Sequence, residues 1–324
     1  MVDNILVSGG AGYIGTVLVH KLLNKGYKVN VADLLIYGDE NLQEHPNLKV
    51  YKIDIRDKDI KRLIEEADVV FHLAGVSNDP GQGLEPKTGR DINYLCTERI
   101  VSYCETLNVK RLIYPSSCSV YGKSDLNIVN EQSIVNPLTE YAICKVLSEE
   151  TILRNSNSSL VRTIIRPATV YGVSPRQRFD LMVNSFVNEA YNLNLIKVKG
   201  PNRIRPSIHI DDLVSLYLKL LDTPASIIDK QIFNAAYENY SVMKKAQIIA
   251  ELVSEKVQIE ILDGEDQRTY KVDTSKLTSL IGFRPRWNIV KGSHELLYEF
   301  YNGKYADSFT NSKYYNKLRQ PQYL

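Results

Sequence analysis

The sequence predicts an α/β fold, in which a Rossmann-type, doubly wound parallel sheet carries helices on both faces and a smaller, mixed C-terminal domain closes over a ligand. Two observations predict the sheet: apolar runs of strand length alternate with segments of helical period over the first half of the chain, and the first run leads straight into a glycine-rich turn. A third observation predicts the second domain, because Pro175, Pro201 and Pro206 break the pattern beyond Pro167.

The individual elements follow from hydrophobic period. The expected strands lie near 4–8, 28–32, 49–53, 68–73, 111–115 and 160–166. The expected helices lie at 13–25, 57–66, 91–107 and 139–155. Strands that alternate with helices in this way pair in parallel, because each helix carries the chain back across the sheet.

Composition and charge exclude several classes of function. The chain has 324 residues, a formal net charge of +2 and 24% charged residues, so no bulk attraction to nucleic acid or to a membrane surface is expected. The four cysteines form no C-x-x-C pair and no cluster with histidine, so we expect no bound metal and a reduced, cytoplasmic protein. The N-terminus enters a strand at once, which leaves no room for a signal peptide, and no apolar run approaches membrane-spanning length.

The glycine-rich turn has the character of a dinucleotide site. A strand-length apolar run precedes Gly9, Gly12 and Gly15, and a segment of helical period follows them. Glycines there allow a tight turn and close approach of a pyrophosphate, and the free N–H groups at the helix N-terminus attract phosphate. Asp33 ends the second strand, 18 residues after Gly15, where a carboxylate meets the adenosine ribose and repels a 2′-phosphate. We therefore expect NAD rather than NADP; the alternative is a glycine-rich turn in some other βαβ unit.

A tyrosine and a lysine one helical turn apart form the candidate catalytic pair. Tyr141 and Lys145 project from the same face of the expected helix. A free tyrosine titrates near pH ~10, and a nearby ammonium together with the positive nicotinamide ring lowers the pKa toward that of a useful base. A surface helix also shows this weak pattern. The serine-rich run at 114–122 strengthens it, because the run follows an expected strand at the sheet edge where ligands bind.

Ten stretches of the chain, in this order, match one known family. They are Gly9 to Gly15, Asp33, Asp54-Ile55, His72 to Gly75, Asn93, Ser116 to Gly122, Tyr141-x-x-x-Lys145, Arg166 to Gly172, Arg205 to Leu213 and Leu280 to Pro285. The sequence thus resembles the extended short-chain dehydrogenase/reductases, and within them the NAD-dependent nucleotide-sugar epimerases and dehydratases typified by UDP-galactose 4-epimerase. The resemblance implies a nucleotide-diphosphate sugar as substrate and a homodimer paired through helices 91–107 and 139–155. It also implies an NAD-binding Rossmann domain at 1–170, rejoined by about 205–236, and a substrate-binding domain at 171–204 and 237–324.

The resemblance further implies a role for individual residues. Ser117, Tyr141 and Lys145 would be catalytic, Asp33 would hold the adenosine ribose, and Arg205 would grip the substrate diphosphate through bidentate hydrogen bonds unless it is a surface arginine. The further residues implied for the cofactor, which Tyr141 and Lys145 would also contact, are Gly9, Gly12, Tyr13, Ile14, Gly15, Asp54, Ile55, Leu73, Ala74, Gly75, Asn93, Ser116 and Pro167. The further residues implied for the substrate are Ser77, Ser119, Thr169, Arg176, Arg178 and Arg268.

The positions after the catalytic serine narrow the reaction. The 4,6-dehydratases of this superfamily carry an Asp-Glu pair after the catalytic residue, and this chain has Cys118 and Ser119 there, so 4,6-dehydration is not expected. Cys118 is interpreted as a small packed residue. The reaction that remains for this site is oxidation of the sugar at C4. We expect an epimerase that reduces the 4-ketone from the opposite face, in the synthesis of polysaccharide or glycan precursors.

Two alternatives stay open. The Ser-Pro-Arg-x-Arg run at 174–178 is similar to a bacterial polysaccharide subfamily that includes GDP-heptose 4-dehydrogenases, so a nucleotide-sugar 4-dehydrogenase or 4-ketoreductase is the first. There, Arg176 and Arg178 would meet phosphate or sugar, or would form a solvated basic turn. A non-catalytic NAD-binding sensor is the second, and it is disfavoured because the tyrosine, the lysine and the hydroxyl are all present. The polar, tyrosine-rich tail 301–324 predicts no function.

Overall fold

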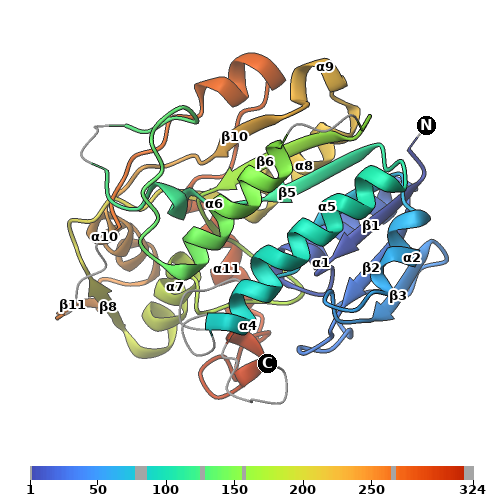
Figure 1. Cartoon of the computed structure of the whole chain (residues 1–324). Coiled ribbons are helices and arrows are strands. Elements are labelled where there is room, and N and C mark those ends of the chain that lie inside the picture. Colours follow the sequence, from blue (N-terminus) through green and yellow to red (C-terminus); the bar gives the residue numbers. More distant parts are fainter. Residues whose placement is uncertain (1, 77–85, 125–127, 155–157, 264–267, 317–324) are drawn as a thin grey trace.

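A seven-stranded parallel sheet forms the centre of the structure, a computed structural model that describes residues 2–76, 86–124, 128–154, 158–263 and 268–316 (Figure 1). The strand order is β10-β6-β5-β4-β1-β2-β3. The strands are β1 (Asn4–Ser8), β2 (Lys28–Asp33), β3 (Leu48–Lys52), β4 (Val69–His72), β5 (Arg111–Pro115), β6 (Val161–Pro167) and β10 (Gln231–Ala235). From β1 the chain continues to β2 and β3 on one side of the sheet, and it then crosses to β4, β5 and β6 on the other side. Sheets of this kind bind ligands at such a crossover point, outside the carboxyl ends of the strands.

Helices cover both faces of this sheet, which confirms the predicted fold class. On one face α1 (Tyr13–Asn24) packs beside α8 (Ile210–Asp222). On the other, α5 (Cys96–Thr106) packs between α2 (Ile60–Glu65) and α6 (Glu140–Leu153). Because successive side chains of a strand point to opposite faces, Ile5 and Val7 join the core under α1 and α8, and Leu6 joins the core under α2 and α5. Each of the six expected strands is present to within one residue at either end.

The helix expected at 91–107 is more elaborate in the structure. A short helix α4 (Pro86–Arg90) is followed by one turn of π-helix, η1 (Asp91–Leu95), and then by α5. The apolar residues of this segment form a stripe along one side of the helix. Cys96, Ile100 and Cys104 of this stripe are buried, whereas Leu95 is 42% exposed, so the stripe mostly faces the sheet. The stripe is therefore explained by packing within the chain and does not by itself mark a subunit interface.

The C-terminal elements form a smaller, mixed unit with its own core. Helices α7 (Met182–Leu193), α10 (Val242–Val253) and α11 (Ile289–Tyr301) pack against one another. The smaller unit also contains β8 (Leu195–Lys199) and β11 (Gln258–Leu262). The other described elements are β7 (Thr169–Tyr171), β9 (Ser207–His209), α9 (Ala225–Ile228), the 3-10 turns η2 (Cys118–Tyr121) and η4 (Ser312–Tyr314), and the π-turn η3 (Leu277–Ile281). Parallel pairs join β8 to β11 and β7 to β9. Between these elements the chain returns to the central sheet through α8 and β10; the exact domain limits stay a prediction.

The described part of the tyrosine-rich tail has a structural role. The rings of Tyr305 and Tyr314 lie 5.1 and 5.4 Å from the ring of Phe179, centroid to centroid. The backbone N–H of Phe179 donates to the carbonyl of Tyr314 at 2.9 Å. The tail therefore packs onto the segment that follows β7. Among the described residues, no helix is both long and apolar enough to cross a membrane.

Candidate active site

The glycine-rich turn brings the backbone of β1 close to that of β4. Gly9 has a φ of +75°, and a Cβ there would lie 2.6 Å from the backbone nitrogen of Ala74. A Cβ on Gly15 would lie 2.3 Å from the carbonyl oxygen of Gly9. Helix α1 begins after Gly12, and no side chain caps its first turn. Its free N–H groups and its dipole therefore form an anion site, as a dinucleotide pyrophosphate requires.

Asp33 lies at the end of β2 and is fixed by backbone contacts. One carboxylate oxygen accepts the N–H of Ala11 at 3.0 Å, and the other accepts the N–H of Leu35 at 2.9 Å. Burial raises the pKa of this carboxyl, and the two N–H donors act against that rise. A carboxylate oxygen accepts more than one hydrogen bond, so Asp33 can still accept from ribose hydroxyls.

Asp54 and Asn93 both make polar contacts within the protein. The Arg56 guanidinium lies 2.7 Å from the Asp54 carboxylate, and although burial raises the pKa of Asp54, these hydrogen bonds bring it below its ordinary value. Asn93 accepts from the N–H of Val76 at 2.8 Å and donates to the carbonyl of Val76 at 3.0 Å. Asn93 thus shapes the segment after β4 that contains Leu73, Ala74 and Gly75. Ser77 lies outside the described residues.

Lys145 connects helix α6 to the end of β5. Its buried ammonium donates to the carbonyl of Pro115 at 2.7 Å and to the hydroxyl of Tyr114 at 3.1 Å. It lies 5.7 Å from the ring centroid of Tyr141, which is only half-buried. Burial lowers the pKa of Lys145, whereas the negative charge of a Tyr141 phenolate would raise it. By the same coupling, the ammonium stabilises the phenolate that a general base requires.

The serine-rich run forms a tight turn between β5 and α6. Ser117 caps the N-terminus of η2, and its hydroxyl accepts the N–H of Ser119 at 3.1 Å. The hydroxyls of Ser116 and Ser119 are buried, and they have no hydrogen-bond partner among the described residues. Helix α6 packs against η2, so the hydroxyls lie at the same end of the sheet as Tyr141. Buried hydroxyls without partners are rare in proteins, and a bound polar ligand would satisfy them.

Cys118 is a packed residue rather than a reactive one. Its thiol is buried and donates to the carbonyl of Arg166 at 3.1 Å. Burial raises the pKa of this thiol, and the charges of Arg166 and Arg205 only partly oppose the rise. A thiol held protonated and out of reach is a poor nucleophile.

Arg205 and Arg268 lie on two segments that contact each other. The N–H of Arg205 donates to the carbonyl of Tyr240 at 3.1 Å, and its carbonyl accepts from the buried Lys245. Thr269, next to Arg268, accepts the N–H of Ile204 through its hydroxyl at 3.1 Å. These contacts place the two arginines on adjacent segments.

Thr169 and Pro167 lie on the other side of the Arg205 segment. Thr169 pairs in register with Ser207, and Pro167 ends β6. Thr169 therefore lies on the strand beside the segment that carries Arg205.

Arg176 and Arg178 are placed differently from one another. Arg178 is paired with Asp180 through two hydrogen bonds, at 2.9 and 2.7 Å. The guanidinium carbon of Arg176 lies 3.9 Å from the ring centroid of Tyr37, in the segment that follows β2. Both side chains are buried, so the alternative of a solvated basic turn is wrong.

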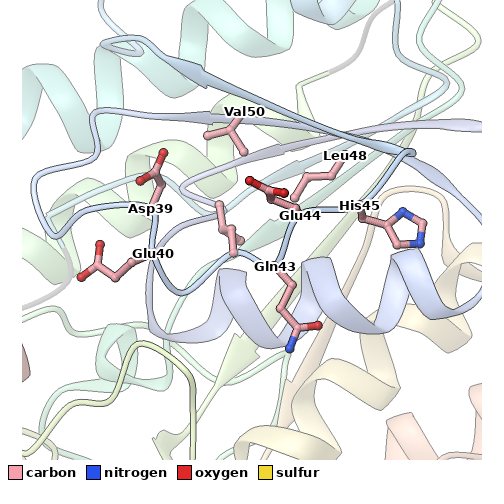
Figure 2. A pocket seen from close by; sticks show the side chains of 8 residues that line it. Asp39, Glu40, Gln43, Glu44, His45, Leu48 and Val50 are labelled. Atoms are coloured by element: carbon pink, nitrogen blue, oxygen red, sulfur yellow. The ribbon is translucent and has the colours of Figure 1, made fainter.

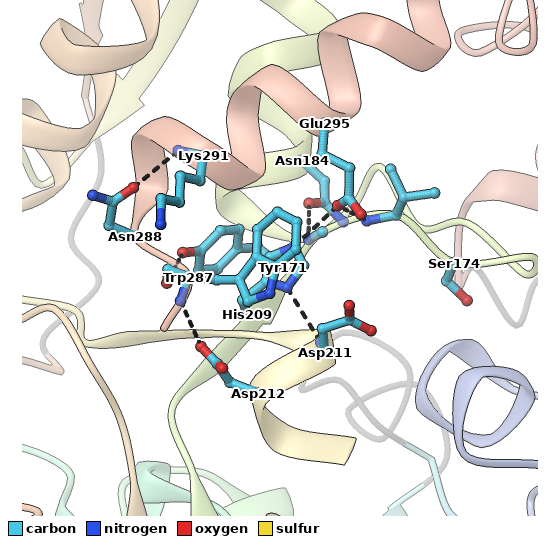
Figure 3. Close-up of polar contacts among 12 residues, drawn as sticks. Tyr171, Ser174, Asn184, His209, Asp211, Asp212, Trp287, Asn288, Lys291 and Glu295 are labelled. Carbon is cyan, nitrogen blue, oxygen red and sulfur yellow. Dashed lines mark hydrogen bonds and ion pairs between the residues drawn. The ribbon is translucent and has the colours of Figure 1, made fainter. Parts of the chain in front are cut away.

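A histidine holds the strand end that leads to these arginines (Figure 3). His209 is stacked on Trp287 at 4.3 Å and meets Tyr171 edge-on at 5.2 Å. The N–H of Asp211 donates to Nδ1 of His209, so Nε2 carries the proton and donates to Glu295 at 3.0 Å. Glu295 also accepts the N–H of Val173 at 3.1 Å. The start of the 172–181 segment is therefore fixed to α11.

A sequence model of the NAD-dependent epimerase/dehydratase family matches residues 5–236. The chain belongs to this family. It is 29% identical to a putative UDP-glucose 4-epimerase of Methanocaldococcus jannaschii, over 89% of this chain and 95% of that one. It is 26% identical to a UDP-N-acetyl-alpha-D-glucosaminuronate decarboxylase of Bacillus cytotoxicus, over 93% and 98% of the two chains. A solved UDP-glucuronic acid 4-epimerase of Bacillus cereus, in complex with UDP-glucuronic acid and NAD, is 25% identical with a TM-score of 0.83, over 92% and 99% of the chains.

Membership of the epimerase/dehydratase family confirms the predicted superfamily, and the cofactor is NAD. The residues fit this cofactor, because the structure provides an uncapped helix N-terminus beside glycines that tolerate no Cβ, and a carboxylate at the end of β2. The relatives include both epimerases and a decarboxylase at similar identity, so the family alone does not decide the reaction.

Sequence reasoning missed the charged network that joins helix α6 to strand β6. Arg166 donates to both carboxylate oxygens of Glu149, at 2.9 and 2.6 Å, and to the hydroxyl of Tyr121 at 2.9 Å. The Tyr121 hydroxyl donates in turn to Asn234 at 2.7 Å. The available signal was spacing, because Glu149 stands four residues after Lys145 and therefore on the same helix face.

A separate hollow of about 380 Å³ lies beside the edge strand β3 (Figure 2). Leu48 and Val50 of β3 form its apolar wall, and Asp39, Glu40 and Glu44 bring carboxylates to it. None of the predicted catalytic or cofactor-binding residues lines it. An acidic lining is unsuited to a phosphate, so this hollow is no part of the NAD site.

Proposed function

We propose that this enzyme is an NAD-dependent nucleotide-sugar epimerase that oxidises C4 of the sugar and returns the hydride to the opposite face. The observation that carries the proposal is the approach of Lys145 to Tyr141 at the end of the sheet where the buried serine hydroxyls lie. A tyrosine beside a lysine ammonium can accept a proton, and the hydroxyl group of a sugar bound next to Tyr141 can supply it.

Each residue then has a defined task. Tyr141 accepts the proton of the C4 hydroxyl as the C–H bond at C4 breaks, which leaves a ketone, and it returns a proton to that oxygen when the C–H bond re-forms on the other face. Lys145 stabilises the phenolate, and Ser117 hydrogen-bonds the same sugar oxygen. Bound NAD supplies the acceptor, and then the donor, of the hydride. No net redox change results.

The substrate end of the proposal depends on two arginines. Arg205 and Arg268 lie on adjacent segments opposite η2, where two guanidinium groups can hold the diphosphate by charge-assisted hydrogen bonds. Firm binding of the diphosphate leaves the sugar free to turn between the two hydride transfers. The positions of Cys118 and Ser119 carry no carboxylate, so the pair that 4,6-dehydration needs is absent from this turn.

A nucleotide-sugar 4-dehydrogenase or 4-ketoreductase, similar to the GDP-heptose enzymes, is the second candidate. The buried pair Arg176 and Arg178 supports it, because this run distinguishes the chain from the UDP-hexose epimerases. In such an enzyme the ketone would be released instead of being reduced again, and a second oxidant would have to take the hydride that the bound cofactor had accepted.

A panel of UDP-, GDP- and dTDP-sugars tests both candidates. Single-turnover absorbance in the NADH band is recorded for each substrate, and the products are identified by nuclear magnetic resonance. An epimerised product without lasting NADH, and without solvent deuterium at C4, is the expected result. A persistent stoichiometric NADH signal with a released ketone would make the enzyme a dehydrogenase. If NAD is bound but no sugar nucleotide is turned over, the result favours the remaining alternative, a non-catalytic NAD-binding sensor.

We also propose that the enzyme is a homodimer paired through α5 and α6 and that it works in the cytoplasm. The pairing rests on family resemblance, since the apolar stripe of α5 faces the core. Analytical ultracentrifugation at micromolar concentration tests it, and a monomer there contradicts it.

A further inference from the structure

The buried guanidinium of Arg176 is not explained by the proposed reaction. Arg176 is 3% exposed, and Nε, Nη1 and Nη2 have no hydrogen-bond partner among the described residues. A guanidinium normally keeps its donors satisfied, because an unpaired buried donor costs the full free energy of its desolvation. Burial, together with the charge of Arg178, lowers the pKa of Arg176 to about 10. An anion at this position would satisfy the donors and compensate the charge.

The surroundings of Arg176 belong to the cofactor half of the molecule. Its guanidinium is stacked on Tyr37, four residues after Asp33, and its charge lowers the pKa of Asp33 against the larger effect of burial. Ser174, two residues earlier, donates to the carbonyl of Tyr13 at 2.7 Å in the first turn of α1. Arg176 therefore lies between the helix that binds phosphate and the strand end that binds ribose.

The segment that carries Arg176 is fixed at both ends. At its start, the hydroxyl of Tyr13 donates to the carbonyl of Gly172 at 2.8 Å, and Val173 is bonded to Glu295. At its end, Phe179 is bonded to Tyr314 and lies among aromatic rings of the tail. A segment held in this way can present a side chain to a ligand with little loss of conformational entropy.

We propose that Arg176, supported by the ring of Tyr37, is a cofactor-binding residue that donates to the pyrophosphate oxygens of NAD. Helix α1 contributes N–H groups from one side, and Arg176 contributes a planar cation from the segment that crosses above the first turn of α1. The bidentate geometry of a guanidinium suits two phosphate oxygens, and the aromatic ring fixes its plane. This inference requires only the NAD site, not the proposed epimerase reaction. It reassigns Arg176 from the substrate, where sequence resemblance had placed it.

Release of radiolabelled NAD, chased with an excess of unlabelled NAD, tests the proposal without any turnover. Arg176→Gln should release NAD about tenfold faster or more, since a hydrogen bond to a charged group is lost. Arg176→Lys keeps the positive charge but loses the planar guanidinium, so its rate of NAD release should lie between those of Arg176→Gln and wild type. Arg284→Gln, at an exposed arginine, is the matched control and should release NAD at the wild-type rate. Tyr37→Leu removes the ring against which the guanidinium packs and should resemble Arg176→Lys.

Four further ligands test whether Arg176 contacts the pyrophosphate rather than another part of the cofactor or the substrate. ADP-ribose should bind Arg176→Gln more weakly than wild type, by about the factor by which NAD release is accelerated. Adenosine, which has no pyrophosphate, should bind both proteins with equal affinity. UDP and GDP report on the substrate end, and Arg205→Gln should weaken whichever of them the wild type binds while leaving NAD release unchanged. Unchanged NAD release in Arg176→Gln, or a loss confined to UDP or GDP, overturns the proposal. If Arg176→Gln does not fold, the Lys and Tyr37 variants decide by the same criteria.

Discussion

Arg166 donates two hydrogen bonds to the carboxylate of Glu149 in the interior of the protein, and Glu149 lies one helical turn after Lys145. The two side chains are 4% and 6% exposed, and the bonds measure 2.9 and 2.6 Å. Arg166 belongs to β6 and Glu149 to α6, so the pair fixes the helix that presents Tyr141 and Lys145 to the sheet that carries the cofactor site. The position of Tyr141 and Lys145 relative to the sheet therefore depends in part on this buried pair.

Breaking this pair should destabilise the fold. Arg166→Met or Glu149→Leu alone leaves an uncompensated buried charge, for which we expect a loss of about 3–5 kcal/mol in the free energy of unfolding. The double variant removes both charges and should recover most of that loss. Urea unfolding of the four proteins checks the prediction. Additive losses in the double variant would contradict it, because independent sites do not compensate one another.

The proposed base can be removed without disturbing its neighbours. Tyr141→Phe deletes only the hydroxyl, so we expect turnover to fall by about 10²–10⁴-fold while stability and NAD release stay at wild-type values. Tyr298→Phe, at an exposed tyrosine, is the matched control and should leave all three unchanged. The assay uses whichever sugar nucleotide the panel identifies. A near-normal turnover rate in Tyr141→Phe would show that Tyr141 is not the general base.

Asp33 should make the enzyme selective for NAD over NADP. Its carboxylate is held by two backbone N–H groups at the end of β2, where a 2′-phosphate would meet a like charge. We expect wild type to bind NAD more tightly than NADP, and Asp33→Asn to narrow the difference because the repulsion is gone. Calorimetric titration of both cofactors checks this. Equal or tighter NADP binding by wild type would show that Asp33 has another role.

Lys245 should give the folding stability a distinctive pH dependence. Its ammonium is buried and donates to the carbonyl of Arg205 and the hydroxyl of Ser207. Burial lowers its pKa from 10.5 to about 7, and the charge of Arg205 acts in the same direction. Between these two values the unfolded chain binds more protons than the folded one, so stability rises with pH across this window and falls as pH returns toward 7.

Comparison with a neighbouring lysine isolates this effect. Lys245→Met should lose the rise in stability, which for one proton cannot exceed about 1.4 kcal/mol per pH unit. Lys244→Met, at an exposed position on the same helix, should keep it. Urea unfolding at about pH 7.5 and about pH 9.5 measures the difference. Equal slopes in wild type and Lys245→Met would mean that Lys245 keeps an ordinary pKa.

Much of the fold could be predicted because its signals are local. The strand positions follow from short apolar runs, and the cofactor turn follows from glycines whose absent Cβ the structure explains. Tyr141 and Lys145 could be paired because a helix brings residues four apart onto one face. These inferences need only the geometry of a single element.

The remaining features depend on contacts between distant segments. Arg176 could not be placed on Tyr37 from sequence, because the two are joined only when the segment after β7 crosses the first turn of α1. The π-turn at Asp91–Leu95 interrupts the segment 91–107, which the sequence predicts as one continuous helix. The burial of the apolar face of this segment also does not decide the proposed dimer, since period alone does not say whether a face meets the core or a second subunit.

The tyrosine-rich tail should control the segment that bears Arg176. Tyr314 is 7% exposed, packs on Phe179 and Tyr305, and accepts the N–H of Phe179 through its carbonyl. Tyr314→Ala removes the ring but not the backbone bond, so we expect a loss of about 3 kcal/mol in the free energy of unfolding, as for other buried aromatic truncations. We also expect faster release of NAD, because Phe179 stands three residues after Arg176. Tyr298→Ala, at an exposed position on α11, should change neither quantity. A loss of stability without any change in NAD release would show that the tail only braces the smaller unit and that Arg176 is positioned from the other end of its segment, through Val173 and Glu295.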